Sequence, residues 1–156
     1  MDAPDCPCIP TREEGEQSSP LEPTCGAELC PKITGGDSFG TGDFEITNPE
    51  ALECALEALR DRTPGIIRWD AQYEGGQSES IGYVLIDADG QGFSRDWGWQ
   101  DLTFIAEDAL RGPLKDASAF DACLGNANPV VQLDCVRNAL ESTTEICDPE
   151  WYEESI

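Results

Sequence analysis

The amino-acid sequence of 156 residues contains no histidine, only two lysines and no long hydrophobic run. Without histidine, the usual serine and cysteine nucleophiles lack the base that activates them near neutral pH. A phosphate-cradling loop of the form G-x-x-x-x-G-K-[ST] is also missing. These absences predict a protein that is not an enzyme. The enzymatic alternative that stays open is a carboxylate-dependent hydrolase, because it needs only two of the 32 acidic residues.

The sequence contains no run of about 18 apolar residues, so it predicts no transmembrane segment. Its N-terminus lacks the charged and apolar regions of a secretory signal peptide. Because the cysteine content described below favours export, we expect the chain to be the mature form of an exported protein.

Positive charge is scarce, with nine basic residues against 32 acidic ones and a net charge of -23. Phosphate backbones and anionic lipids repel such a chain, so nucleic-acid and peripheral-membrane binding are disfavoured. The partners that fit are cations, basic proteins and neutral ligands such as glycans. The simpler interpretation, which composition alone favours, is that the charge keeps the protein soluble. Composition does not predict an oligomeric state.

Eight cysteines are a high and even number for this length. The spacings Cys6-x-Cys8 and Cys25-x4-Cys30 do not form two C-x-x-C knuckles, which argues against a structural zinc site. A disulfide framework in an oxidising compartment is favoured, at a periplasmic, outer-surface or extracellular location. The cysteines expected in disulfides are Cys6, Cys8, Cys25, Cys30, Cys54, Cys123, Cys135 and Cys147.

Residues 1–45 hold most of the prolines and half of the cysteines, and they show neither helical nor strand periodicity. We expect an irregular segment here, either a disulfide-bonded knot or a tether. In the knot, Cys6 and Cys8 pair with Cys25 and Cys30 in either order.

An α+β domain is predicted from 46 to 150, with a short C-terminal tail over 151–156. Its first element is a helix over 49–62, since Asn48 is a good N-cap and Pro49 suits the first helical position. Leucines and alanines then recur along one stripe of this helix.

Three strand-like runs follow, at 65–73, 80–87 and 92–100. Gly75-Gly76 and Asp89-Gly90 lie between them, and both pairs are typical of two-residue hairpin turns. The domain is therefore predicted to hold a three- to four-stranded antiparallel meander that is packed on helices and stabilised by disulfides.

Two-residue turns place Trp69 opposite Gly82, and Gly82 opposite Trp97. The glycine leaves room for both indoles, so Trp69, Trp97 and Trp99 are predicted to form a core floor under the helix. The alternative is a carbohydrate-binding module in which Trp97 and Trp99 form an exposed platform for a glycan.

The same register places Arg68, Tyr83 and Asp96 side by side on the other sheet face. These side chains are candidates for gripping a polar ligand. A cross-strand row on a solvated face is the simpler interpretation. The apolar stripe through Tyr83 needs cover, either from the N-terminal segment or from a partner.

The run DADGQG at 87–92 resembles the start of a calcium loop, with acids at its first and third positions. Position twelve is Gly98, where a bidentate glutamate is required, so a hairpin turn explains the run better. A weak calcium site formed by Asp87, Asp89 and Asp96 stays as a hypothesis. No other cofactor is expected.

Residues 101–112 carry apolar residues at helical spacing, which favours a helix over a fourth strand. Two further helices are predicted after it, and Cys123 and Cys135 flank the short connection between them. A disulfide between these two cysteines is sterically reasonable, and Cys54 would then pair with Cys147.

Five segments between about residues 48 and 151 follow one another in a distinctive order: ALECALEALRDRTPG, GYVLIDADGQG, DWGWQDL, FDACLGNANPVVQLDCVRNAL and CDPEW. In texture and order they resemble small exported, lipoprotein-like, cysteine-containing proteins of unknown function from myxobacterial-type Gram-negative bacteria. The resemblance implies export, and it transfers no catalytic or binding residue. The predicted function is an exported, non-enzymatic binding or interaction protein of the cell envelope or extracellular space.

Overall fold

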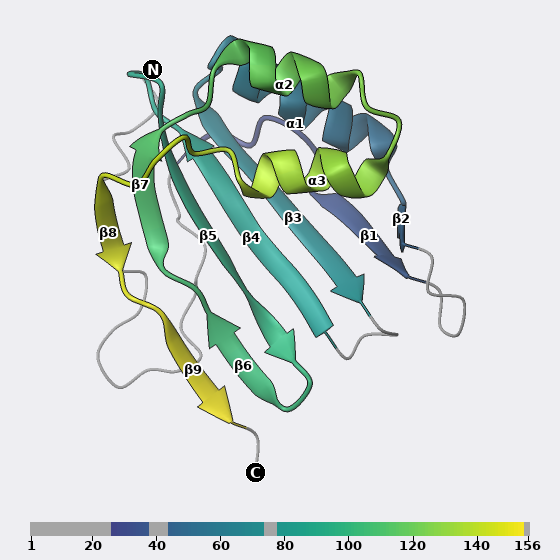
Figure 1. The fold of residues 1–156 in the computed structure, drawn as a ribbon, viewed down its shortest axis with the longest axis vertical. Helices are drawn as coiled ribbons and strands as arrows, with labels where there is room; N and C mark the ends of the chain where they lie inside the picture. Colours follow the sequence, from purple (N-terminus) through teal and green to yellow (C-terminus); the bar gives the residue numbers. More distant parts are fainter. Residues whose placement is uncertain (1–25, 38–43, 74–77, 155–156) are drawn as a thin grey trace.

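The computed structural model describes residues 26–37, 44–73 and 78–154. Within these ranges the chain forms one mixed sheet of nine strands with three helices, as Figure 1 shows. The strand order is β2-β1-β3-β4-β5-β6-β9, and β7 and β8 extend the sheet beside β5. The α+β class is confirmed, but the predicted meander is only the centre of a larger sheet. The elements are β1 (Ile33–Asp37), β2 (Phe44–Ile46), α1 (Pro49–Asp61), β3 (Gly65–Tyr73), β4 (Ser78–Ile86), β5 (Gln91–Gln100), β6 (Thr103–Ala106), β7 (Ala109–Pro113), α2 (Ala117–Leu124), α3 (Pro129–Arg137), β8 (Glu145–Asp148) and β9 (Trp151–Glu154).

All three helices lie on one face of the sheet, which we call the helix-side face (Figure 1). Their leucines, alanines and Phe120 pack on alternate residues of the central strands, among them Ile67, Trp69 and Val84. This main core is almost fully excluded from water. The helices cover the end of the sheet where β3 begins and β4 ends, and they leave the other end of the central strands uncovered (Figure 1).

The helix predicted over 49–62 is α1, but Asn48 does not cap it with its side chain. Instead, Oδ1 of Asn48 accepts a hydrogen bond from the backbone N–H of Thr34 at 2.9 Å, and Nδ2 donates to the carbonyl oxygen of Lys32 at 2.7 Å. Asn48 therefore ties the start of α1 to β1. Asn128, in contrast, caps α3 by accepting a hydrogen bond from a backbone N–H of the first turn.

Part of the segment predicted to be irregular belongs to the sheet. β1 runs parallel to β3, with Ile33 opposite Trp69, and β2 pairs antiparallel with β1. The prediction for residues 1–45 is thus wrong at 33–37 and 44–45. There the edge of β3 supplies hydrogen-bond partners to β1, and β1 supplies them to β2, which no local pattern reveals. Residues 26–32 belong to no named strand, and residues 1–25 and 38–43 of the predicted segment lie outside the described residues.

Two disulfides are present among the described residues. Cys123–Cys135 joins α2 to α3, as predicted. Cys30–Cys54 ties the chain before β1 to α1, so the predicted pairing of Cys54 with Cys147 is wrong, as is the pairing of Cys30 with Cys6 or Cys8. Cys147 is disulfide-bonded as well. The other cysteines lie outside the described residues: Cys6, Cys8 and Cys25.

The β3–β4 register is the predicted one, with Trp69 opposite Gly82. The β4–β5 register differs from the prediction by one residue, so Gly82 lies opposite Asp96 and not opposite Trp97. Because side chains alternate between faces, this shift exchanges the faces of all β5 side chains relative to the prediction. Trp97 leaves the helix-side face, and Asp96 takes its place there.

A longer turn causes the shift. Asp87 and Gln91 close the β4–β5 connection through a backbone hydrogen bond of 3.0 Å, which leaves three residues, 88–90, in the loop. Gly90 has a φ of 78°, the left-handed conformation that such three-residue loops require near their end. The Asp89-Gly90 pair was therefore a correct turn signal with the wrong loop length.

Residues 101–112 form strands and not the predicted helix. β6 pairs with the end of β5, and β7 pairs with its start. A Cβ atom on Gly112 would lie 1.9 Å from the carbonyl oxygen of Ser142, so the loop after α3 needs a glycine there. The unpaired edge of β5 outweighs the helical spacing, because this stretch completes the hydrogen bonding of that edge.

The C-terminal region also extends the sheet. Trp151–Glu154 is strand β9, which pairs with β6, so the tail predicted over 151–156 is wrong for these four residues. In β8, Oδ2 of Asp148 accepts a hydrogen bond of 2.7 Å from Nη1 of the fully buried Arg95. No helix in the described ranges combines the length and the apolar character needed to cross a membrane.

Candidate functional site

The tryptophans divide between two cores. Trp69 lies in the main core, whereas Trp97 joins a second apolar cluster on the opposite sheet face with Tyr83 and Phe93. Trp97 is only 8% exposed, and its ring centre lies 6.2 Å from that of Tyr83. The prediction that the tryptophans are core holds for Trp69 and Trp97, but they do not share one floor.

Trp99 is the more accessible of the two platform candidates, with 36% of its surface exposed. Its ring makes an edge-on contact with Phe104, with the centres 5.5 Å apart. Because Trp97 is buried, the two indoles do not form the flat exposed pair that the glycan platform requires.

The predicted row of Arg68, Tyr83 and Asp96 changes with the register. Tyr83 lies between Arg68 and Arg95, and Asp96 faces the other way. Burial raises the pKa of Tyr83 to about 12. Nε of Arg95 donates to the carbonyl oxygen of Glu107 at 3.0 Å, so this arginine ties β5 to the connection between β6 and β7.

The three calcium candidates do not come together. Oδ1 of Asp87 accepts hydrogen bonds from the backbone N–H groups of Asp89 and Gln91, at 2.8 and 2.9 Å, and thereby closes the β4–β5 turn. Asp96 lies farther along β5 with other partners. Within the described ranges, no three acidic, cysteine or histidine side chains lie close enough to hold a metal ion.

Asp96 instead forms the centre of a polar cluster on the uncovered part of the helix-side face. Its Oδ2 accepts three hydrogen bonds: from Ser80 Oγ at 2.5 Å, from Trp69 Nε1 at 3.2 Å and from Arg137 Nε at 3.3 Å. None of these bonds involves Oδ1. Burial raises the pKa of the Asp96 carboxyl, although all three donors oppose the shift.

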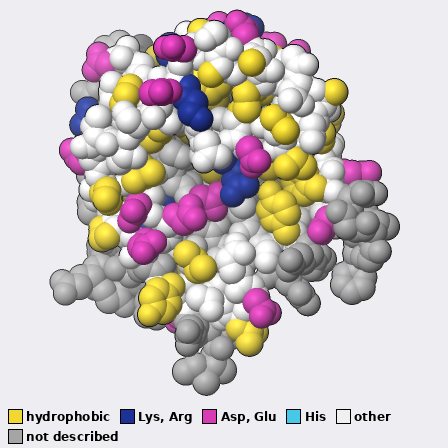
Figure 2. All heavy atoms as spheres, in the orientation of Figure 1, with side chains coloured by type: hydrophobic (Ala, Val, Ile, Leu, Met, Phe, Trp, Pro, Cys, Tyr) yellow, Lys and Arg dark blue, Asp and Glu magenta, His cyan; other side chains and the backbone are white. Residues whose placement is uncertain are grey.

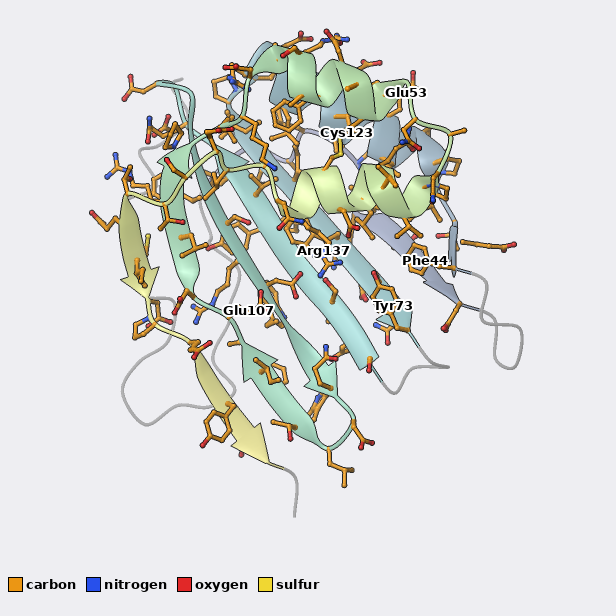
Figure 3. All side chains as sticks on the ribbon, viewed as in Figure 1. Phe44, Glu53, Tyr73, Glu107, Cys123 and Arg137 are labelled. Atoms are coloured by element: carbon orange, nitrogen blue, oxygen red, sulfur yellow. A yellow bond between two sulfur atoms is a disulfide. The ribbon has the colours of Figure 1, made fainter. Side chains whose placement is uncertain are left out.

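Arg137 comes from the last turn of α3 and projects over the sheet beyond the helix (Figure 3). Its Nη1 lies 3.4 Å from Asp134, so it is shared between Asp134 and Asp96. Its side chain is 29% exposed, and among the described residues it is the one positively charged donor to Asp96.

Glu107 is the cross-strand neighbour of Asp96, because its backbone N–H donates to the carbonyl oxygen of Asp96 at 2.9 Å. Partial burial raises the pKa of Glu107, and the negative charge of Asp96 adds to this effect. The side chains of Asp108 and Glu150 act on it in the same direction. A largely buried carboxyl, Asp96, and an exposed one, Glu107, thus lie side by side near Arg137, and both have raised pKa values.

An aromatic pair borders the cluster on the other side of Arg137. Tyr73, at the end of β3, stacks on Phe44 of β2 with the ring centres 5.1 Å apart. The charges of Arg137, Asp134 and Asp96 all act on the pKa of Tyr73, which burial raises. Figure 2 shows acidic side chains on one side of a central basic side chain and a hydrophobic patch on its other side. We call the region formed by Asp96, Glu107, Arg137 and Tyr73 the Asp96 surface.

A hollow of about 220 Å³ adjoins this surface at Arg137, where the loop after α3 passes β5 and β7. Its lining includes Ser94, which lies two residues before Asp96 and on the same face of β5. The hollow is lined by Ser94, Leu110, Arg137, Asn138, Leu140, Glu141, Ser142 and Thr143.

No protein-family model matches the chain, and neither does any curated protein or solved structure. The assignment of a function therefore rests on the chemistry of the Asp96 surface.

Sequence reasoning missed most of this surface. Asp96 was considered, but for the wrong face, and Glu107 lay in a stretch expected to be helical. Arg137 follows Cys135 in the second of the two helices predicted after residue 112. Nothing in the local sequence indicates that its side chain reaches the sheet. A three-residue turn after β4, in place of the two-residue turn that was assumed, would have predicted that Asp96 lies on the helix-side face.

Proposed function

We propose that the chain is an exported, non-enzymatic binding protein that holds a basic segment of a partner protein on the Asp96 surface. The observation that carries the proposal is the pair of cross-strand carboxyls, Asp96 and Glu107, both with raised pKa values and with one shared arginine nearby. A lysine or arginine of a partner would add a second positive charge beside Arg137 and would lower both pKa values.

Three further features support a basic partner. The net charge of -23 attracts positively charged molecules over the whole surface and speeds their encounter. The stacked rings of Phe44 and Tyr73 provide an apolar flank for the stem of a long basic side chain. The hollow beside Arg137 accommodates a neighbouring side chain of the same segment.

Export is part of the proposal. Two disulfides within the described residues are compatible with an oxidising compartment, and so is the disulfide-bonded state of Cys147.

The test compares two double variants that carry the same net charge. Asp96→Asn with Glu107→Gln removes the two carboxylates of the site, and Glu53→Gln with Glu57→Gln removes two exposed ones from α1. The probe is a fluorescently labelled oligolysine peptide, and its affinity is measured by anisotropy at low and high salt. We expect the site variant to bind at least about tenfold more weakly than the α1 variant, equivalent to about 1.4 kcal/mol.

Equal losses in the two variants would show that only the overall charge attracts the peptide, and the site proposal would fall. Circular dichroism of both variants checks that the fold is kept, since amide side chains preserve the shape of the carboxyls.

A carboxylate-dependent hydrolase is the second candidate, and the same pair favours it. Two neighbouring acids, of which one is held by three hydrogen bonds, resemble the acid and base pair of a glycoside hydrolase. Release of nitrophenol from a panel of 4-nitrophenyl glycosides, abolished by Asp96→Asn and unaffected by Glu53→Gln, would support hydrolysis over binding.

A further inference from the structure

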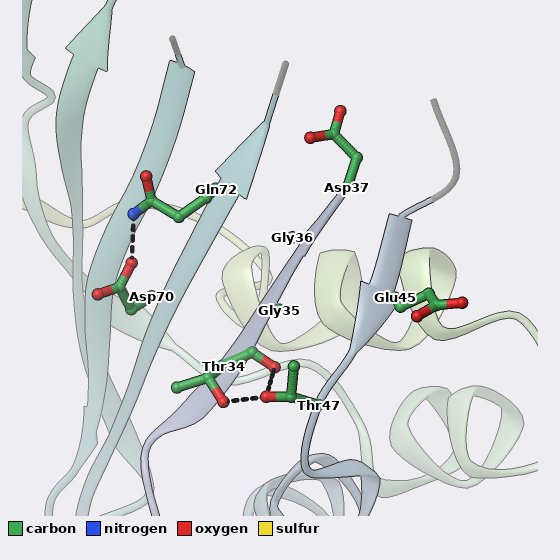
Figure 4. A pocket seen from close by; sticks show the side chains of 8 residues that line it. All are labelled: Thr34, Gly35, Gly36, Asp37, Glu45, Thr47, Asp70 and Gln72. Atoms are coloured by element: carbon green, nitrogen blue, oxygen red, sulfur yellow. Dashed lines mark hydrogen bonds between the residues drawn. The ribbon is translucent and has the colours of Figure 1, made fainter. Parts of the chain in front are cut away.

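A groove of about 460 Å³ crosses β2, β1 and β3 on the sheet face opposite the helices (Figure 4). It lies on that face because Asp70 and Gln72, which line it, alternate along β3 with the core residues Trp69 and Ala71. The groove is therefore separate from the Asp96 surface, and the inference below goes beyond the proposed function.

Two cross-strand rows shape the groove. In one row Thr34 of β1 lies opposite Asp70, and Thr47, just past β2, is joined to Thr34 by hydrogen bonds. In the other row Gly36 lies between Glu45 and Gln72. Because the middle position of the second row has no side chain, the floor there is bare backbone with polar side chains on either side (Figure 4).

The hydrogen-bond donors of these side chains are already used. Nε2 of Gln72 donates to Oδ1 of Asp70 at 2.7 Å and to Glu79 at 3.2 Å. The hydroxyl of Thr47 donates to the carbonyl oxygen of Thr34 at 3.0 Å and is also hydrogen-bonded to the Thr34 hydroxyl. The groove therefore offers hydrogen-bond acceptors: the side-chain amide oxygen of Gln72 and the carboxylates of Asp70 and Glu45.

Asp70 and Gln72 belong to β3 and Glu45 belongs to β2, with β1 between them. The acceptors therefore flank the bare floor from two strands that lie about 9.6 Å apart, twice the usual spacing of neighbouring strands. A metal ion requires oxygen ligands that converge to about 2.0–2.6 Å, and the described residues hold no such group. The acceptors suit a ligand that carries donors on two opposite edges.

We propose that this groove binds a neutral saccharide. The hydroxyl groups on one edge of a pyranose ring donate to Asp70 and Gln72, those on the opposite edge donate to Glu45, and the ring lies against the bare backbone at Gly36. A neutral ligand also keeps its affinity at high salt, in contrast to a basic peptide on the Asp96 surface.

The experiment uses ¹⁵N-labelled, oxidised full-length protein titrated with neutral disaccharides (cellobiose, maltose and lactose) at high salt. The readout is the shift of the backbone amide signals of Gly36 and Gln72. Gly36→Leu fills the groove and keeps every charge. Gly125→Leu is its matched control, because a Cβ on this exposed glycine would lie no closer than 3.6 Å to the nearest atom.

We expect at least one disaccharide to shift these signals in the wild type and in Gly125→Leu, and to bind at least about tenfold more weakly to Gly36→Leu. A Cβ on Gly36 would lie 3.2 Å from the backbone carbonyl oxygen of Gln72, so Gly36→Leu also presses on β3. Gln72→Leu is therefore a second variant, which removes an acceptor without this contact and has the same expected loss. Spermidine, a linear cation with N–H donors, serves as the competing probe.

Three results would overturn the proposal: no disaccharide shifts the groove signals, the shifts survive in both groove variants, or only spermidine produces them. Failure here leaves the oligolysine test of the Asp96 surface untouched, because the two probes and the two sheet faces differ.

Discussion

The indole of Trp69 lies over the bare backbone of its cross-strand partner Gly82. A Cβ atom on Gly82 would lie 2.4 Å from Cζ2 of Trp69 and 2.3 Å from the carbonyl oxygen of Arg95. No real side chain tolerates such distances, so Trp69 or β5 would have to move. Because Trp69 also donates to Asp96, this glycine helps to position the candidate site as well as the core.

Gly82→Ala is therefore expected to lower the free energy of unfolding by about 1–3 kcal/mol through overpacking. Urea denaturation of the oxidised protein measures the change, followed by tryptophan fluorescence. Gly125→Ala is the control, with an expected change within about 0.5 kcal/mol. A Gly82→Ala protein as stable as the control would show that the indole does not depend on this gap.

The buried ion pair of Arg95 and Asp148 leads to a prediction of non-additivity. Arg95→Met leaves the carboxylate of Asp148 buried without its partner, and a loss of about 3–5 kcal/mol is expected. Adding Asp148→Leu removes the orphaned charge, so the double variant should recover much of that loss. Thermal unfolding of the wild type, both single variants and the double variant gives the coupling; additive losses would contradict it.

Asp96 should make stability depend on pH with a definite sign. Its carboxyl has a pKa above the ordinary 3.8, because burial disfavours the charged form. The folded state thus keeps this proton to higher pH than the unfolded chain. The associated stability is complete below about pH 3.8 and is lost as the pH rises through the folded pKa.

Asp96→Asn does not titrate, so its stability relative to the wild type should improve as the pH rises across that window. Urea denaturation at a series of pH values from about 3 to 7 measures the difference. The control is Asp89→Asn, which makes the same substitution in the exposed β4–β5 turn, outside the polar cluster. A flat difference for Asp96→Asn would mean that this carboxyl titrates as in the unfolded chain.

The disulfides Cys30–Cys54 and Cys123–Cys135 should differ in their contributions to stability. Cys30–Cys54 closes a separation of 24 residues and Cys123–Cys135 one of 12. Replacing either pair with alanines should cost about 2–4 kcal/mol, and loss of the longer loop should cost about 0.6 kcal/mol more. Urea denaturation of the two double variants provides the comparison, and the reverse order would contradict the loop-entropy argument.

Local signals in the sequence determined α1, the three central strands, the β3–β4 register and the Cys123–Cys135 disulfide. These features depend on short-range chemistry: the stripe of leucines and alanines, the glycine pair between β3 and β4, and two cysteines on neighbouring helices. The absence of histidine and the excess of acidic residues are likewise properties of the sequence alone.

Tertiary structure alone decided the parts that bear on function. Four segments are strands because a neighbouring edge offers them hydrogen bonds: β1 pairs with β3, β6 and β7 pair with β5, and β9 pairs with β6. The hydrophobic periodicity of a segment does not reveal which edge is free to pair with it. One extra residue in the β4–β5 turn placed Asp96 under Arg137 and sent Trp97 to the opposite face. Because side chains alternate between the two faces of a strand, one residue more or less in a turn moves every side chain of the next strand to the other face. The local sequence specifies the length of such a turn less clearly than its presence.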